Sequence, residues 1–251
     1  MGKLLDRKSQ TQTIPPLVEG DRLNLEEYLR RYEASPEGVR AELIAGVVYI
    51  NSEADVHPTG GSVPPISLEG HSVPQSKVHF WLEFYVMNTF GVQAGAPATL
   101  VLPTGRTASE PDAFLRILPE LGGSTIDKGD DYLHGSPELL IEVAKSSAGT
   151  DLGPKLKEYR KAGVEEYIVW RTKPNLIEWL TLRGLRNDIP LEPDVKGTVR
   201  SSSFPGLWLN VPAMCARDSA SVLRTLQLGL ASPEHAAFVA KLRAKAKRKK
   251  K

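Results

Sequence analysis

The stretch SPELLIEVAKSS, residues 136–147, decides the fold of this chain. Its centre, PELLIEVA, is an apolar run as long as one buried strand, and Glu142 lies inside it. A carboxylate in such a run is costly unless a cation or hydrogen-bond donors pair with it. Lys145, at the end of the run, is the nearest cation in the sequence and therefore the first candidate partner.

The segments that follow this strand predict a crossover to a parallel strand. Thr150 or Asp151 is expected to cap a helix that runs through Lys161, and Gly163 is expected to end it. The next apolar run, EEYIVWR, is typical of a second buried strand. A strand, a helix and a further strand in this order indicate an α/β (α+β) fold with a mixed sheet flanked by helices.

The rest of the chain supplies further strands and helices. Helical spacing covers residues 23–34 and 73–90, and two helical stretches near the C-terminus are separated by Ser232 and Pro233. Strand patterns cover 40–50 with a turn near Ala45 and Gly46, and then 98–103, 112–118, 175–183 and 204–209. The predicted organisation is a flexible leader (1–20), a main domain (21–212), a helical extension (213–240) and a basic disordered tail (241–251).

Composition indicates an ordinary soluble globular protein. The 251 residues are 41% hydrophobic and 25% charged, and the mean hydropathy is −0.25. No apolar run approaches the ~20 residues of a membrane span, and the N-terminus lacks the apolar core of a signal peptide. Cys215 is the only cysteine, which excludes a disulfide within the chain and a zinc site built from cysteines. We expect a cytoplasmic protein with no membrane partner.

The C-terminal tail changes the charge balance. KLRAKAKRKKK (241–251) carries eight basic residues and no acid, so removing it from the net charge of +2 leaves −6 on the rest of the chain. A polybasic end attracts phosphate backbones without sequence specificity. The other interpretation, a tail that only improves solubility, is equally compatible with the sequence.

Three acids have positions that favour a role in a metal-binding catalytic site. Glu42, Asp112 and Glu142 each lie in or at the start of a predicted strand. Any one of them alone is more often a strand-end carboxylate that meets solvent or a basic neighbour. Together, on strands that are expected to be neighbours, they would repel one another unless a hard divalent cation is shared, and Mg²⁺ combines such carboxylates with waters and phosphate oxygens.

The motifs in this region resemble those of the Uma-two family of restriction endonucleases, within the PD-(D/E)XK nuclease superfamily. The resemblance spans residues 20–243 and is densest between Glu142 and Tyr167. The residues that carry it are Glu42 to Gly46 (ELIAG), His71, Pro111-Asp112, Glu142-Val143, Asp151, Lys155, Tyr159 and Gly163 to Tyr167 (GVEEY).

The resemblance implies a restriction-endonuclease-like fold that cuts DNA with Mg²⁺, for which Mn²⁺ is a substitute. By the same resemblance, Asp112 and Glu142 bind the metal together with the carbonyl of Val143. Glu42 is the additional acid, and Glu42, Asp112, Glu142 and Lys155 form the catalytic set. No small-molecule cofactor is implied.

The position of the lysine follows from strand parity and from the family pattern. The superfamily places Glu-x-Lys on one strand, but here Ala144 stands at the lysine position. Lys145 is three residues after Glu142 and faces the other side of a regular strand. The family arrangement uses a lysine on the following helix, which matches Lys155, whereas Lys157 points elsewhere. The alternative is an exposed Lys155 that pairs only with Asp151.

Auxiliary roles are open for three residues. Asp151, Lys155 and Tyr159 are spaced by four, so they share one helix face. His71 matches a family position and is expected either to contact the site or to cap a helix. Gln75 stands where a related bacterial branch often has a second histidine, so a histidine pair is not expected, and His57 and His79 show no ligand spacing.

Two functions from different classes remain open at this stage. The first is a Mg²⁺-dependent endonuclease that acts on DNA. The second is a catalytically silent nucleic-acid-binding module that uses the fold and the basic tail, and a partner-binding role of residues 165–211 is a weaker third. A homodimer is compatible with cutting both strands but does not follow from the sequence, which also does not distinguish DNA from RNA.

Overall fold

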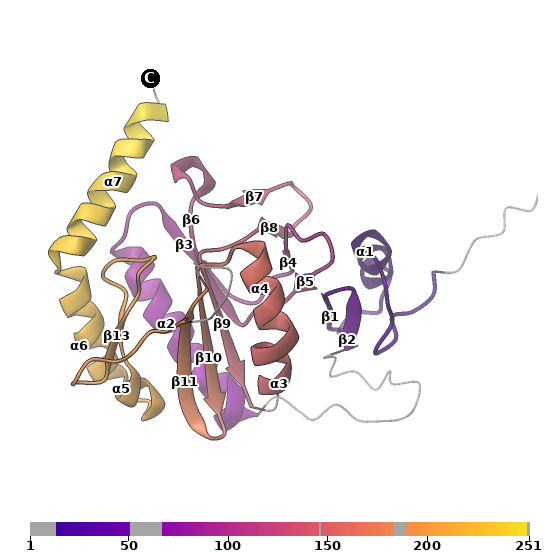
Figure 1. Cartoon of the computed structure of the whole chain (residues 1–251), viewed down its shortest axis with the longest axis horizontal. Coiled ribbons are helices and arrows are strands. Elements are labelled where there is room, and N and C mark those ends of the chain that lie inside the picture. Colours follow the sequence, from indigo (N-terminus) through magenta and orange to yellow (C-terminus); the bar gives the residue numbers. More distant parts are fainter. Residues whose placement is uncertain (1–13, 51–66, 146, 183–188, 250–251) are drawn as a thin grey trace, which may run out of the picture.

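The computed structural model describes residues 14–50, 67–145, 147–182 and 189–249. Within these ranges, helices flank two mixed sheets of six strands each (Figure 1). The α/β class with mixed sheets is confirmed, although the sequence indicated one sheet rather than two. The strand positions predicted from the sequence are otherwise matched by the hairpin at 41–50 and by the strands around residues 100, 115, 141, 169 and 178.

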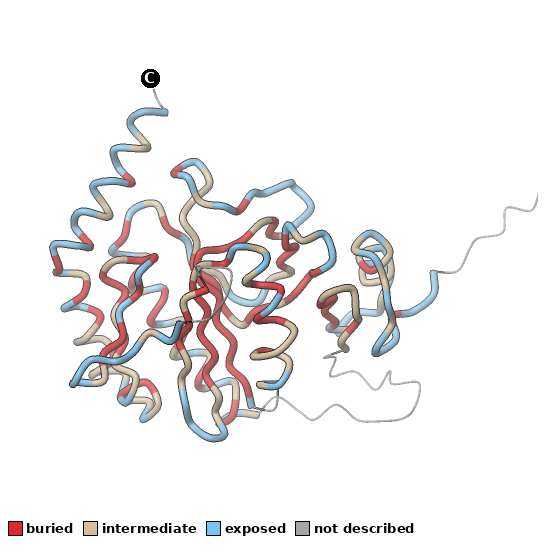
Figure 2. Tube along the Cα trace, in the orientation of Figure 1, coloured by how far each residue is buried: buried red, intermediate tan, exposed pale blue. Residues whose placement is uncertain are grey.

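The central sheet is built around the stretch that decided the fold. Its strand order is β12-β11-β10-β9-β6-β3, and β9 pairs in parallel with β10, which confirms the predicted crossover. All six residues of β9 are buried, and the central strands form the most buried part of the molecule in Figure 2. The bounds are β3 Val92–Gly95, β6 Ala113–Ile117, β9 Leu139–Ala144, β10 Glu166–Thr172, β11 Asn175–Thr181 and β12 Ile189–Pro190.

The second sheet brings the N-terminal hairpin to the central sheet. Its strand order is β2-β1-β5-β4-β8-β7, with a parallel pair only between β4 and β8 among the described strands. The turn between β1 and β2 uses Ala45 and Gly46, both with positive φ. The bounds are β1 Ala41–Ile44, β2 Val47–Ile50, β4 Leu100–Val101, β5 Ala108–Ser109, β7 Thr125–Asp127 and β8 Leu133–Gly135.

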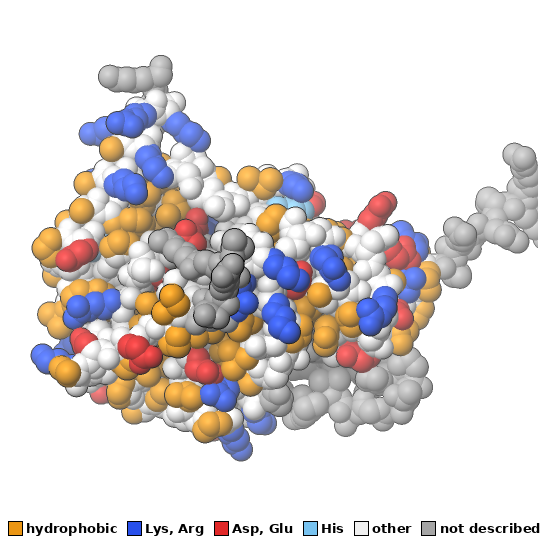
Figure 3. All heavy atoms as spheres, in the orientation of Figure 1, with side chains coloured by type: hydrophobic (Ala, Val, Ile, Leu, Met, Phe, Trp, Pro, Cys, Tyr) orange, Lys and Arg blue, Asp and Glu red, His pale blue; other side chains and the backbone are white. Residues whose placement is uncertain are grey.

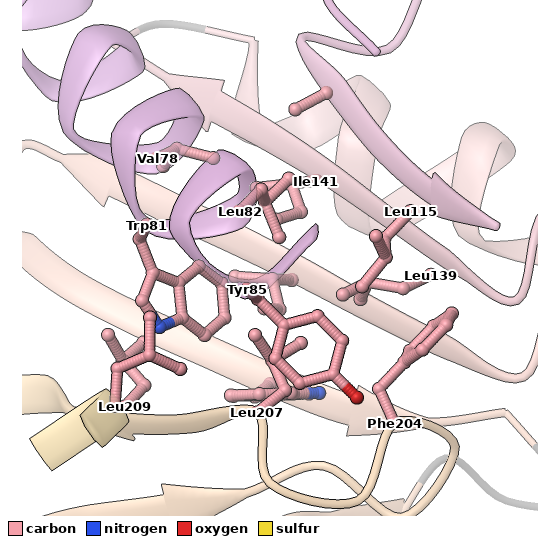
Figure 4. Close-up of a cluster of buried hydrophobic side chains, with 14 of the residues drawn as sticks. Val78, Trp81, Leu82, Tyr85, Leu115, Leu139, Ile141, Phe204, Leu207 and Leu209 are labelled. Atoms are coloured by element: carbon pink, nitrogen blue, oxygen red, sulfur yellow. The ribbon is translucent and has the colours of Figure 1, made fainter. Parts of the chain in front are cut away.

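The two faces of β9 contact different helices because side chains alternate along a strand. Leu139, Ile141 and Val143 belong to the core cluster of α2 (Val73–Met87), which Figure 4 shows around Trp81 and Tyr85. Leu140 and Ala144 belong to the cluster of α4 (Leu156–Ala162). Glu142 has the parity of Leu140 and Ala144, so the strand directs it toward the α4 side.

The helix between β9 and β10 begins earlier than the sequence indicated. It starts with α3 (Ala148–Thr150), continues through the π-helical η3 (Asp151–Lys155) and ends with α4 at Gly163, which adopts a left-handed conformation. Thr150 stands at the N-cap position of η3 but makes no side-chain cap hydrogen bond, and Asp151 lies inside the helical run, so the predicted side-chain cap is not present. Asp151 instead accepts a hydrogen bond from the Ser147 hydroxyl at 2.7 Å, and this leaves its other oxygen for the interior.

Further helices precede and cover the sheets. α1 (Leu25–Glu33) has Asn24 as its N-cap, the π-helical η1 (Leu68–Ser72) leads directly into α2, and η2 (Pro119–Leu121) is a short 3₁₀ turn. No helix in the described ranges is long and apolar enough to cross a membrane.

The C-terminal third packs on the same core as α2. It contains β13 (Thr198–Arg200), β14 (Trp208–Asn210), α5 (Val211–Cys215), α6 (Ser219–Leu230) and α7 (Pro233–Lys249). The tail expected to be disordered is helical as far as Lys249. Three properties explain the difference. Ala, Lys and Arg favour helices, basic residues suit a helix C-terminus, and Leu242 is buried while Lys245 donates to the Leu121 carbonyl.

His235 attaches α7 to the preceding elements and gives a pH-dependent prediction. Its Nδ1 lies 2.9 Å from the Leu230 carbonyl, which only accepts, so Nε2 is the acceptor for the Thr89 hydroxyl at 2.9 Å. Burial lowers the pKa of His235, so the folded protein resists a proton that the unfolded chain takes up near pH 6.5. Stability is therefore expected to be complete above pH 6.5 and to fall as the pH drops below it.

Urea denaturation at pH 8 and at pH 5.5 checks this expectation. Wild type should lose more unfolding free energy between the two pH values than His235→Gln, which keeps a donor and an acceptor but cannot be protonated. Equal losses in the two proteins would show that His235 does not carry this pH dependence.

Candidate active site

Glu142 meets a buried lysine on the α4 side of β9. The Nζ of Lys155, which ends η3, lies 3.0 Å from Glu142 Oε1. The Lys155 side chain is 6% exposed and that of Glu142 6% exposed, so the two charges pair away from bulk water. The partner of Glu142 is thus Lys155, ten residues after Lys145, and not Lys145 itself.

The same ammonium joins carboxylates from different parts of the chain. Lys155 Nζ lies 3.0 Å from Oε1 of Glu42 on β1 and 3.6 Å from Oδ1 of Asp151 on η3. The alternative of an exposed lysine that pairs only with Asp151 is excluded by this geometry. Burial by itself lowers the pKa of Lys155, but the carboxylates of Glu142 and Glu42 reverse this effect, and the pKa lies well above its ordinary value.

Hydrogen bonds hold these carboxylates in place. Glu42 Oε1 accepts from the backbone N–H of Glu110 at 2.6 Å. The Tyr159 hydroxyl donates to Glu142 Oε1 at 3.2 Å and lies 3.1 Å from the Ser109 hydroxyl. The shared helix face of Asp151, Lys155 and Tyr159 that the sequence indicated therefore points into this cluster.

Asp112 lies at the start of β6, beside the end of β9. The register Ala113↔Ile141 places it next to the Glu142–Val143 peptide, and its Oδ2 accepts from the Val143 N–H at 2.7 Å. Its Oδ1 accepts from the Gln75 amide at 3.2 Å and lies 3.3 Å from His71 Nε2. Asp112 is thus fixed by the backbone of β9 and by the helix that begins at η1.

His71 bridges Asp112 and the Val143 carbonyl. Its Nδ1 lies 3.0 Å from the Val143 carbonyl oxygen, which only accepts, so Nδ1 carries a proton. Its Nε2 faces the Asp112 carboxylate, which also only accepts when ionised. Both nitrogens are therefore donors, and the hydrogen bond with Asp112 raises the pKa of His71. Of the two expectations for His71, contact with the site holds and the helix cap does not.

The sequence did not indicate the roles of Gln75 and His79. His79 Nε2 lies 2.9 Å from the backbone carbonyl of Asp112. His71, Gln75 and His79 are spaced by four residues, so one helix face delivers all three to Asp112. This spacing was the available signal, but the partner strand could not be identified because it lies more than thirty residues away in the chain.

Other candidates lie away from the cluster. Lys145 follows β9 and is exposed, and its stem lies beside Gly70 rather than in the cluster around Glu142. Lys157 is exposed on the outer side of α4. His57 lies outside the described residues.

The cluster has an excess of negative charge. Burial raises the pKa of the Glu142 carboxyl well above its usual range, although Lys155 opposes this effect. Nearby negative charges raise the pKa further, and they come from Asp151, Asp112 and Glu42. Burial likewise raises the pKa of Asp151. A cation that joined this group would relieve both the burial cost and the mutual repulsion.

The oxygen donors of the site suit a hard cation in type. The Asp112 and Glu142 carboxylates and the Val143 carbonyl are ligands that Mg²⁺ takes, together with several waters. Within the described ranges, no group of three or more His, Cys, Asp and Glu side chains is placed to hold an ion. The contacts explain this result, because Lys155 lies between Glu42 and Glu142, and His71 lies between Asp112 and the Val143 carbonyl.

A comparison with protein-family models shows to which family the chain belongs. The family model described as Uma2, putative restriction endonuclease, matches residues 25–212. The chain belongs to the Uma2 family. The matched range contains Glu42, Asp112, Glu142 and Lys155, whereas α6 and α7 lie beyond it.

A solved structure supports the same fold for this Uma2 member. A putative nuclease of the DUF820 group from Anabaena variabilis superposes with a TM-score of 0.56 at 16% sequence identity, covering 77% of this chain and 98% of that chain. At this identity the match concerns the fold alone. The search of curated proteins found no match.

The shared ammonium leads to a stability prediction. Lys155→Met should destabilise the protein by about 3–5 kcal/mol, because it leaves the buried Glu142 and Glu42 carboxylates without their cation. Adding Glu142→Gln to Lys155→Met should cost less than the sum of the two single changes. Urea denaturation measures all four proteins, with the exposed Lys157→Met as the matched control, expected within about 0.5 kcal/mol of wild type. Additive effects would contradict the pairing.

Proposed function

We propose that this Uma2 protein is a Mg²⁺-dependent endonuclease that hydrolyses phosphodiester bonds of DNA. The observation that carries the proposal is the buried Lys155 ammonium, 3.0 Å from both Glu142 and Glu42. Beside it, Asp112 is bound to the backbone of the strand that carries Glu142. A structural core does not need this arrangement, because replacing a buried ion pair with apolar side chains is often neutral or stabilising.

The metal in this proposal is held by Asp112, Glu142 and the carbonyl of Val143, with Mn²⁺ as a substitute for Mg²⁺. Two carboxylates, one carbonyl and waters match the way Mg²⁺ is commonly bound next to phosphate. When bound, the ion supplies charge neutralisation at the phosphoryl oxygens and a lowered pKa for a coordinated water.

The side chains of this protein then position the remaining groups. Glu142 and Glu42 keep Lys155 protonated, so its N–H groups can donate to the attacking water or to the charged phosphoryl group. Glu42 is held by the Glu110 N–H and Tyr159 by Ser109, which limits the movement of the cluster. The water oxygen attacks phosphorus, the bond to the 3′ oxygen breaks, and the products carry a 5′-phosphate and a 3′-hydroxyl.

The second candidate function is nucleic-acid binding without turnover, and the basic helix α7 favours it. Lys and Arg side chains cover the end of α7, which extends away from the body (Figures 1 and 3). This function requires salt-dependent binding that survives changes at Asp112 and falls when residues 247–251 are removed. A deletion from residue 241 would be less informative because it removes the buried Leu242.

Plasmid cleavage tests the proposed activity. Wild type should nick or linearise plasmid DNA with Mg²⁺ or Mn²⁺, and EDTA should abolish the reaction. Asp112→Asn and Glu142→Gln keep the size of each side chain but remove a negative charge that the metal requires. Each should reduce the rate by about 100-fold or more. Equal cleavage by wild type and both variants, or cleavage in EDTA, would refute the proposal.

The two lysines near the strand give a second test of the same site. Lys155→Ala should reduce the cleavage rate at saturating DNA severely, by about 100-fold or more, because it removes the ammonium beside Glu142. Lys145→Ala should leave this rate nearly unchanged, because its side chain lies outside the cluster. Circular dichroism confirms that each variant is folded. The reverse order of effects would overturn the assignment of Lys155.

A further inference from the structure

The buried cluster reaches solvent on one side. The Asp112 and His71 side chains are 15% and 29% exposed, whereas those of Lys155 and Glu42 are 6% and 4% exposed. A substrate phosphate therefore approaches past Asp112 and His71. Because the interior carries an excess of carboxylates, an incoming phosphate would be repelled unless cations flank this opening.

Arg40 lies at this opening on the side of the N-terminal hairpin. It stands two residues before Glu42 at the entry to β1, and the alternation along a strand gives both residues the same side. The hydrogen bond with Asp112 raises the pKa of His71, and the positive charge of Arg40 opposes this rise, in keeping with a position on the same side as Glu42. Arg40 is exposed and makes no side-chain hydrogen bond or ion pair within the described part of the chain.

Lys145 lies at the opening on the side of the central sheet. It is the first residue after β9, and its stem passes over Gly70, the residue before His71. A Cβ at Gly70 would lie 2.9 Å from Lys145 Cδ and 3.2 Å from Cγ, so the glycine leaves room for this stem. Lys145 is exposed, and its ammonium has no hydrogen-bond or ion-pair partner among the described residues.

We propose that Arg40 and Lys145 form a cationic rim around the opening and that each contacts a backbone phosphate of duplex DNA next to the scissile bond. This inference rests on the proposed function and adds the residues that bind its substrate. Arg40 precedes a strand of one sheet and Lys145 follows a strand of the other, so the rim contacts the backbone at two points and orients it over Asp112. The planar guanidinium of Arg40 suits two hydrogen bonds to one phosphate, whereas Lys145 acts as a point charge.

Salt-dependent DNA binding tests the rim. Binding of a labelled duplex is followed by fluorescence anisotropy over a range of salt concentrations, with Ca²⁺ in place of Mg²⁺ to limit hydrolysis. Each phosphate contact adds about 0.9 to the slope of log affinity against log salt, which corresponds to about fivefold in affinity at 0.15 M relative to 1 M salt. Arg40→Ala and Lys145→Ala should each lower the slope by about 0.9, and the double variant by about 1.8.

Matched variants distinguish specific contacts of the rim from a general effect of the protein's net charge. Lys128→Ala removes an exposed positive charge beside β7, at the opposite edge of the sheet from the β1–β2 hairpin, and should leave the slope at the wild-type value. Arg40→Lys should keep the slope, because it preserves the charge. In plasmid cleavage, both rim variants should raise KM and leave kcat nearly unchanged.

The outcomes separate the rim from the catalytic proposal. Wild-type slopes in both rim variants, or no salt-dependent binding by wild type, would overturn the rim. Tighter binding of single-stranded DNA or RNA than of duplex DNA would also overturn it. Lower slopes without cleavage by wild type would support the rim and refute the nuclease. Cleavage by wild type with unchanged slopes in the variants would support the nuclease and refute the rim.

Discussion

The Lys155 ammonium is the interaction on which the rest of the site depends. It contacts Glu42 from one sheet and Glu142 from the other, so it joins the two sheets electrostatically where they meet. Its position is set by the π-helical turn of η3, which also carries Asp151. A lysine buried in this way stays charged only because carboxylates surround it, and those carboxylates stay close together only because the lysine is there.

The sequence predicted the parts of this site that depend on local periodicity. Alternation along residues 139–144 separates Glu142 from Lys145, and the four-residue spacing places Asp151, Lys155 and Tyr159 on one helix face, whereas the choice of Lys155 came from the family resemblance. The alternation and the shared helix face need only the geometry of one strand or one helix. The crossover from β9 to β10 follows in the same way from an apolar strand, a helix and a second apolar strand.

Long-range pairing was beyond the sequence. The spacing of His71, Gln75 and His79 places them on one helix face but does not identify Asp112 as their partner, because this contact arises only when α2 packs against the β6 and β9 strands. The division into two sheets has the same origin, since short strands such as β4 and β5 acquire partners only in the folded chain. The end of α7 was misjudged for a different reason. A run of basic residues repels itself when isolated, but Leu242 and Lys245 attach this helix to the body.

The charges in and around the site have a consistent spatial order. Carboxylates and one ammonium lie in the interior, His71 lies at the opening, and Arg40 and Lys145 lie outside. Such an order costs stability, because each buried charge has lost its hydration and the carboxylates raise one another's pKa values. A protein that needed only a stable core would be served equally well by apolar side chains at these positions. The proposed nuclease function would account for this order, because a phosphate requires cations along its approach and a metal bound to it requires oxygen ligands.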